Sequence, residues 1–137
     1  MKHATMGAHA IGAVLLAIGL AVPAGATPPL LEGSQLYMHA CAACHGVTAD
    51  GRGPVAEVLS PPPRDLRTLA HRYGDPLPTD RIAQFIDGRE LVKAHGPREM
   101  PVWGEELRER GKGPDPEAAV RRKIDAIVAY LVTLQTK

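Results

Sequence analysis

The sequence predicts an all-α fold. Apolar residues recur at the three- and four-residue spacing of a helix in four separate segments. No stretch of useful length alternates between polar and apolar residues as a half-buried strand does. Thirteen Pro and 14 Gly in a chain of 137 residues separate these segments, and both residue types break helices and build turns. We therefore expect one small domain of short helices joined by stiff loops.

The first 26 residues are predicted to be a secretory signal peptide. They have the parts of such a leader, which are Lys2, an apolar run over residues 8–22 ended by Pro23, and the small residues Ala24-Gly25-Ala26. Cleavage near Ala26 leaves residues 27–137 as a mature domain without a membrane span, in the periplasm. The alternative is a leader retained as an anchor, but the run is shorter than the about 18–20 apolar residues that cross a bilayer.

The first helix of the mature domain is expected to begin near Leu31 and to carry apolar residues on one face as far as Cys44. Gly46 should end it, because glycine readily adopts the backbone conformation found after a helix. The stretch from Gly51 to Pro63 holds three consecutive prolines and can be neither a regular helix nor a central strand. A loop is expected there.

Three further helices are expected, each bounded by residues that favour helix ends. They run from Asp65 to Gly74, from Thr79 or Asp80 to Gly88, and from the pair Asp115-Pro116 to about Leu134. The last of them has one apolar side, formed by Val120, Ile124, Ile127, Val128, Leu131 and Leu134.

The two cysteines lie in the string Cys41-Ala42-Ala43-Cys44-His45, which is the CxxCH signature of c-type haem attachment. On a helical turn both sulfurs lie on one face, where both can form thioether bonds to one porphyrin. His45 would then be the proximal ligand of the iron. A thioredoxin-like pair lacks a preceding strand, a zinc site lacks a second cysteine pair, and a disulfide across so short a loop would stabilise little.

The chain resembles the class I monohaem cytochromes c at several places. These are residues 33–46, Gly51-Arg52-Gly53-Pro54, the segment Met100-Pro101-Val102-Trp103-Gly104, and a closing helix with Tyr130-Leu131. The resemblance spans nearly all of the mature domain and is specific at the haem string and the Met-Pro segment. It implies three to five helices wrapped around one covalently bound haem c and its iron, with the N- and C-terminal helices crossing. Gly33 and Tyr37 would suit that crossing, unless Gly33 merely precedes the helix.

Met100 is the expected distal ligand. Pro101 pushes its backbone toward an extended conformation, and the only other methionine of the mature domain, Met38, lies beside the attachment site. The resemblance supports the same choice. His95 is the rival, because an imidazole also binds iron well.

A few more residues are expected to support the ligands or the haem. The resemblance implies that the carbonyl of Pro54 accepts the other N–H of the proximal histidine, with Pro62 and Pro63 as alternatives. Trp103 could pack on, or donate to, a haem propionate. The candidates for neutralising the propionates are Arg52, Arg64 and Arg67.

The predicted function is outer-sphere electron transfer between periplasmic redox proteins by a monomeric carrier that is not itself an enzyme. Sixteen basic and 15 acidic residues give a formal charge of +1, so the basic surplus of a nucleic-acid binder is missing, and docking should rely on a local patch at the haem edge. Two alternatives remain. One is a ligand-binding or peroxidase-like haem protein with a labile distal ligand, and the other is a haem subunit of a larger dehydrogenase or oxidase complex.

Overall fold

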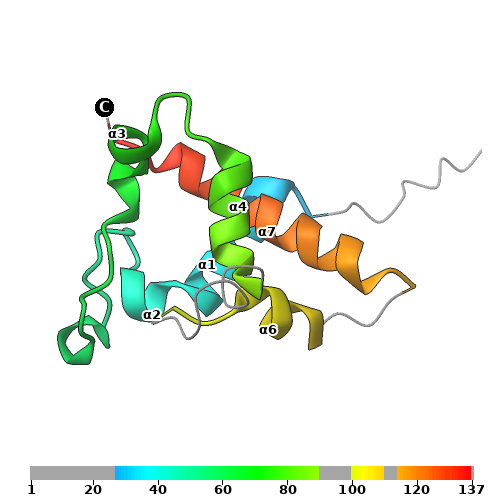
Figure 1. Ribbon diagram of the computed structural model, residues 1–137, viewed down its shortest axis with the longest axis horizontal. Coiled ribbons are helices and arrows are strands. Elements are labelled where there is room, and N and C mark those ends of the chain that lie inside the picture. Colours follow the sequence, from blue (N-terminus) through cyan, green and yellow to red (C-terminus); the bar gives the residue numbers. More distant parts are fainter. Residues whose placement is uncertain (1–26, 90–99, 110–113, 137) are drawn as a thin grey trace, which may run out of the picture.

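The computed structural model describes residues 27–89, 100–109 and 114–136, and within these ranges it holds helices and no strand (Figure 1). The all-α prediction is confirmed. The α-helices are α1 (Pro29–Ala40), α2 (Ala42–His45), α3 (Leu69–Tyr73), α4 (Thr79–Asp87), α6 (Trp103–Glu109) and α7 (Pro116–Thr133), and the single 3-10 turns are η1 (Ala56–Val58) and η2 (Leu66–Thr68). The described ranges hold one α-helix more than the three to five expected, because α2 and α3 are single short turns.

The residues expected at the helix ends occupy those positions. The Asp115 carboxylate accepts the Ala118 N–H at 2.9 Å and caps α7, while Gly88 ends α4 in the left-handed conformation, with φ of 74°. Asp65 caps η2 by accepting the N–H of Arg67 at 2.9 Å. The helix expected from Asp65 to Gly74 is therefore present, but divided into a 3-10 turn and a short α-helix.

Helix α6 was not among the elements expected from the sequence. It is seven residues long, too short to show a helical repeat of apolar residues. Glu105 and Glu106 in its first turn are the available signal, because acidic side chains stabilise a helix N-terminus. Leu107 is its buried apolar residue.

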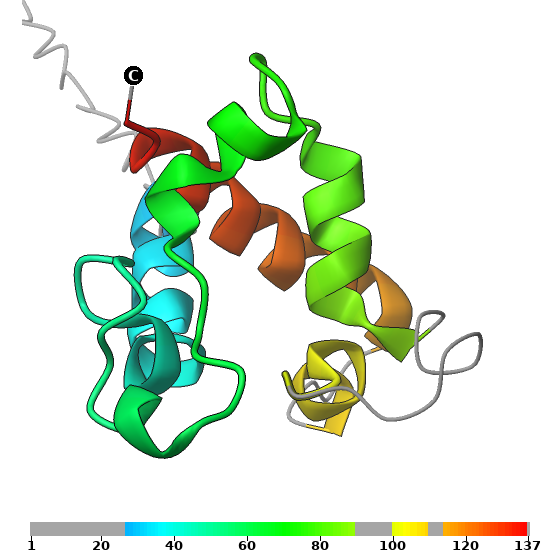
Figure 2. The same cartoon turned by 60° about the vertical axis from the view of Figure 1, so that its left-hand side comes forward.

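Helices α1 and α7 cross in close contact, as expected (Figure 2). Gly33 lies inside α1 and is buried. A Cβ atom there would overlap the carbonyl oxygen of Ala126 and lie 3.1 Å from the Cβ atom of Tyr130. One turn later, the rings of Tyr37 and Tyr130 pack with centroids 5.4 Å apart. Glycine is therefore needed at Gly33 for the two backbones to approach.

We expect Gly33→Ala to destabilise the fold by about 2–3 kcal/mol, because the new methyl group meets main-chain atoms that cannot rotate away. Chemical denaturation of the purified protein measures the change. Gln35→Ala, at an exposed position of the same helix, is the matched control. Equal stability of the two variants would mean that the helices do not cross at Gly33.

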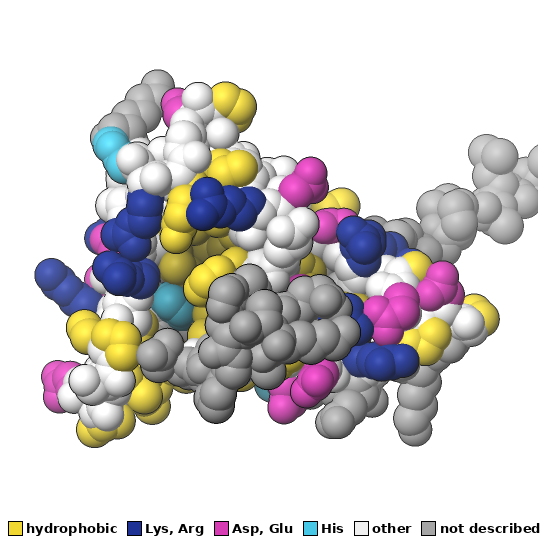
Figure 3. Space-filling model, in the orientation of Figure 1, with side chains coloured by type: hydrophobic (Ala, Val, Ile, Leu, Met, Phe, Trp, Pro, Cys, Tyr) yellow, Lys and Arg dark blue, Asp and Glu magenta, His cyan; other side chains and the backbone are white. Residues whose placement is uncertain are grey.

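The core is concentrated at this crossing. Its largest fully buried side chains are Tyr37, Ile127 and Val120, which all belong to α1 or α7. Figure 2 shows α2 and the loop that follows it on one side of the molecule and α4 and α6 on the other, with α7 passing behind. The surface between the two sides is hollowed, and hydrophobic side chains form its visible walls (Figure 3).

Candidate functional site

The cysteine–histidine string lies at the junction of α1 and α2. Cys41 is both the C-cap residue of α1 and the N-cap residue of α2. Its N–H donates to the carbonyl of Tyr37 at 2.8 Å, and its own carbonyl accepts the N–H groups of Cys44 at 3.1 Å and His45 at 2.8 Å. Cys44 follows Cys41 by three residues, so this one turn of helix brings both side chains to the same side. Gly46, with φ of 82°, then turns the chain away.

Cys41 and Cys44 both carry free thiols, so no disulfide joins them. Burial and, to a smaller extent, the nearby Cys44 sulfur raise the pKa of the Cys41 thiol to about 12. Cys41 is therefore held as a protonated thiol. Thioether formation adds an S–H group across a vinyl group, so Cys41 is in the chemical state that attachment requires.

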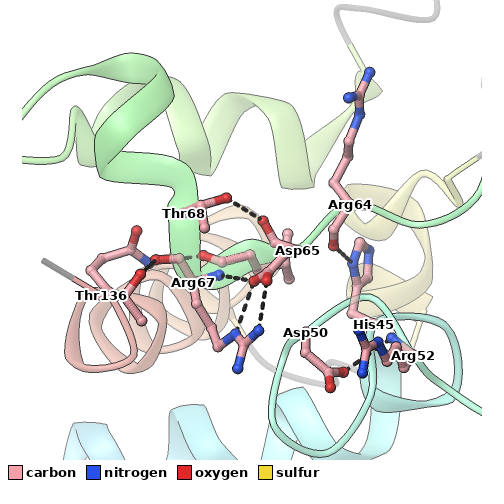
Figure 4. Close-up of polar contacts among 10 residues, drawn as sticks. His45, Asp50, Arg52, Arg64, Asp65, Arg67, Thr68 and Thr136 are labelled. Carbon is pink, nitrogen blue, oxygen red and sulfur yellow. Dashed lines mark hydrogen bonds and ion pairs between the residues drawn. The ribbon is translucent and has the colours of Figure 1, made fainter.

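The ring of His45 is fixed by a backbone acceptor. Its Nδ1 lies 2.9 Å from the carbonyl oxygen of Arg64 (Figure 4). A carbonyl oxygen only accepts hydrogen bonds, so Nδ1 carries the proton and Nε2 keeps its lone pair for a metal. Such a bond also raises the basicity of the imidazole as a ligand. The ring has the tautomer that an axial ligand needs.

The acceptor at this ring differs from the expected Pro54, and it is neither Pro62 nor Pro63. Pro54 is exposed, because its segment lies along the backbone of α2 and not beside the imidazole. Gly53 makes this possible, since a Cβ atom there would come within 2.6 Å of the Cys44 carbonyl carbon. Three amides of the segment donate to the last carbonyls of α2: Gly53 to Cys44 at 3.1 Å, Val55 to Ala43 at 3.1 Å, and Gly51 to His45 at 2.8 Å.

Tyr37 ties the end of α2 to the core. Its side chain is fully buried, and its hydroxyl donates to the carbonyl of Gly46 at 2.7 Å. Burial raises the pKa of Tyr37 far above its ordinary value, so the hydroxyl remains a donor. The residue that follows His45 is thus held from within the contact between α1 and α7.

The three candidate arginines have different surroundings. Arg67 forms a two-pronged pair with Asp65, with the shorter contact at 2.7 Å between Nη2 and Oδ2, and this hydrogen bond lowers the pKa of that carboxyl. The side chain of Arg64 points away from the His45 ring that its carbonyl binds (Figure 4). Arg52 is exposed, and its N–H donates to Asp50. The guanidinium group of Arg67 is therefore already paired with Asp65, while Arg52 and Arg64 are exposed.

Met100 is half-buried and lies three residues before the start of α6. Trp103, the first residue of α6, is also half-buried and packs against the hydrophobic core cluster. In Figure 2 this helix faces α2 from the opposite side of the molecule. The rival ligand His95 lies outside the described residues.

Arg89 joins the helices on the Met100 side. Its guanidinium binds both carboxylate oxygens of Asp87 at 2.8 Å and one oxygen of Glu117, at the start of α7, at 2.8 Å. A Cβ atom at Gly104 of α6 would lie 2.5 Å from Nε of Arg89. The end of α4 and the starts of α6 and α7 therefore meet at this guanidinium.

We expect Asp87→Asn to destabilise the fold by about 1–2 kcal/mol at pH 7. The hydrogen bond from Arg89 lowers the pKa of Asp87 below the ordinary 3.8. A lowered carboxyl pKa contributes stability above the unfolded value and loses it as the pH falls through the folded value. Melting temperatures measured from pH 7 to pH 2.5 should therefore show a gap that closes below about pH 4.

The control for this pH series is Asp125→Asn, which changes an exposed carboxylate on α7. It should melt close to the wild type throughout. A gap for Asp87→Asn that is as large at pH 2.5 as at pH 7 would show that the charge of Asp87 contributes nothing.

The described residues fit a porphyrin. The hollow between α2 and α4 has apolar walls (Figure 3), and the largest fully buried side chains belong to α1 and α7. The free thiols and a histidine with Nδ1 already bonded lie on the α2 side. A flat apolar group with two reactive vinyl carbons matches this combination.

Among the residues that the structure describes, no group of three or more His, Cys, Asp and Glu side chains is placed to hold a metal ion. In the same part of the chain, no helix has both the length and the apolar character needed to cross a membrane.

Comparison with known protein families gives a match over most of the chain. Residues 30–135 fit the family model described as Cytochrome c, which covers all the elements described above apart from the first residue of α1. No curated protein and no solved structure matches the chain.

Proposed function

The chain belongs to the cytochrome c family, and on this basis we propose that it is an exported electron carrier whose haem iron is bound by His45 and Met100. Members of this family carry covalently bound haem c and transfer electrons through its iron. The observation that carries the proposed ligation is the His45 ring, fixed by the Arg64 carbonyl at 2.9 Å beside two free thiols.

Each residue has a defined part in the proposed site. Cys41 and Cys44 would attach the porphyrin through thioether bonds, Nε2 of His45 would bind the iron, and Met100 would supply its thioether sulfur as the second protein ligand. When bound, the haem supplies a one-electron couple between ferrous and ferric iron.

Ligation by both His45 and Met100 would decide the kind of reaction, because it would leave no position on the iron for a substrate. The haem would then supply electron transfer without any bond being made or broken. The visible walls of the hollow are hydrophobic (Figure 3), and such walls would disfavour water around a bound haem. A dry site disfavours the extra charge of the ferric state and raises the potential, as methionine ligation also does.

Periplasmic redox proteins are the proposed partners, and the leader at residues 1–26 is the proposed route of export. Loss of Lys2 with the leader leaves 15 basic and 15 acidic residues, so long-range attraction should be weak. Docking then depends on a local surface. Lys and Arg side chains stand along one edge of the hollow (Figure 3), which places positive charge near the proposed electron exit.

Covalent attachment and full ligation can be tested on the protein purified from the periplasm. We expect the haem to remain with the polypeptide in acidified acetone and to be released after Cys41→Ser combined with Cys44→Ser. We also expect the visible spectrum of the reduced protein to stay unchanged when carbon monoxide is added. Carbon monoxide binding to the untreated protein would overturn the electron-carrier proposal in favour of a ligand-binding or peroxidase-like role.

A further inference from the structure

The C-terminal residues Gln135 and Thr136 bind the segment that contains η2 and α3. Gln135 uses both ends of its side-chain amide, and Thr136 uses its main chain and its hydroxyl. Gln135 Oε1 accepts the Ala70 N–H at 2.9 Å, and Gln135 Nε2 donates to the Leu66 carbonyl at 2.9 Å. The same Nε2 also donates to the Leu131 carbonyl of α7 at 2.8 Å. The N–H and the hydroxyl of Thr136 donate to the Arg67 carbonyl at 2.9 and 3.2 Å.

The opposite side of the same segment binds the haem string and the loop after it. The Arg64 carbonyl accepts from His45, and the Leu66 N–H donates to the carbonyl of Ala49 at 2.8 Å. Leu66 therefore bonds through its N–H to the haem loop and through its carbonyl to Gln135. Figure 4 shows this order in space, from Thr136 through Arg67 to Arg64 and His45.

The Arg64 carbonyl is held through its neighbours: Leu66 bonds to Ala49 and to Gln135, and Gly51 packs closely on the backbone at Arg64. Arg64 follows the prolines at residues 61–63, which lack N–H groups and cannot form a hydrogen-bonded ladder. The Ala70 N–H belongs to the first turn of α3, where amides have no partner within the helix. Gln135 supplies that partner from just beyond α7, and its amide therefore ties Leu66 of η2 and the first turn of α3 to the end of α7.

We propose that Gln135 is a positioning residue for His45: through η2 it holds the Arg64 carbonyl against Nδ1 of the axial imidazole. This inference rests on the proposed function, in which His45 binds the iron. A carbonyl at Nδ1 makes the imidazole a stronger donor to iron, and a stronger donor stabilises the ferric state. Loosening the carbonyl therefore raises the reduction potential and exposes the Nδ1 proton to water.

The test compares holoproteins with Gln135→Ala, Gln135→Glu and, as the matched control, Gln35→Ala at an exposed position of α1. The readouts are the reduction potential and the solvent-exchange rate of the His45 Nδ1 proton by NMR. We expect Gln135→Ala to raise the potential and to speed exchange about tenfold or more. Gln135→Glu keeps the acceptor for Ala70 but loses both donated bonds, so it should shift both readouts in the same direction by less.

A Gln135→Ala protein that melts at a lower temperature but keeps the wild-type potential and exchange rate would overturn the proposal, because the side chain would then be only structural. If this variant yields no holoprotein, Gln135→Glu decides between the same two results. Failure of the proposed function is separate, because it would appear in the wild type as a His45 ring that lacks the NMR shifts of an iron ligand.

Discussion

Met100→Ala should abolish the absorption band that arises from charge transfer between sulfur and ferric iron. It should also lower the reduction potential by on the order of 0.1–0.3 V, within the ~0.8 V range that axial ligands span. The thioether favours ferrous iron, and water or another side chain in its place favours ferric iron. Visible spectra of the oxidised protein and a redox titration measure both changes.

Two further variants make this result specific. Met38→Ala removes the other methionine of the mature domain, which lies on α1 and is 49% exposed, and it should leave the band and the potential unchanged. His95→Ala should also leave the band and the potential unchanged. Loss of the band in His95→Ala with its survival in Met100→Ala would transfer the distal position to His95.

The sequence predicted the structure best at helix ends, where the backbone conformation depends on residues that are close in sequence. Asp65 and Asp115 were expected to cap helices, and both carboxylates accept amides in the first turn that follows. The same holds for Gly88, whose positive φ ends α4. Gly33 could be linked to a helix crossing because glycine weakens a helix unless close packing requires it.

The partner of the proximal histidine could not be predicted in the same way. His45 and Arg64 are 19 positions apart, and any residue type presents a carbonyl, so no side-chain pattern marks the acceptor. The resemblance pointed to Pro54, but the loop from Gly51 to Pro63 first contacts the α2 backbone, and the chain reaches the ring only at Arg64, just after this loop. Gln135 was missed for a related reason, since its amide bonds mainly to main-chain atoms distant in sequence.

Without haem, the domain is expected to be largely unfolded. The sequence has three Tyr, one Trp and one Phe, and the described core is concentrated where α1 crosses α7. The hollow between α2 and α4 would then expose its apolar walls to water (Figure 3). Each large apolar side chain that loses its packing costs about 1.5–3 kcal/mol, so a few of them approach the ~5–15 kcal/mol by which domains are stable.

Haem binding and folding are then linked, because the haem binds the folded chain and not the unfolded one. Residues 27–137 produced in the cytoplasm, without export and attachment, should lack most of the helical circular dichroism of the holoprotein and should melt without a cooperative transition. The holoprotein from the periplasm is the control. A compact apoprotein with a sharp melting transition would show that the contact between Gly33 and Ala126 and its surrounding core are sufficient for folding, and that the porphyrin only occupies a site already formed.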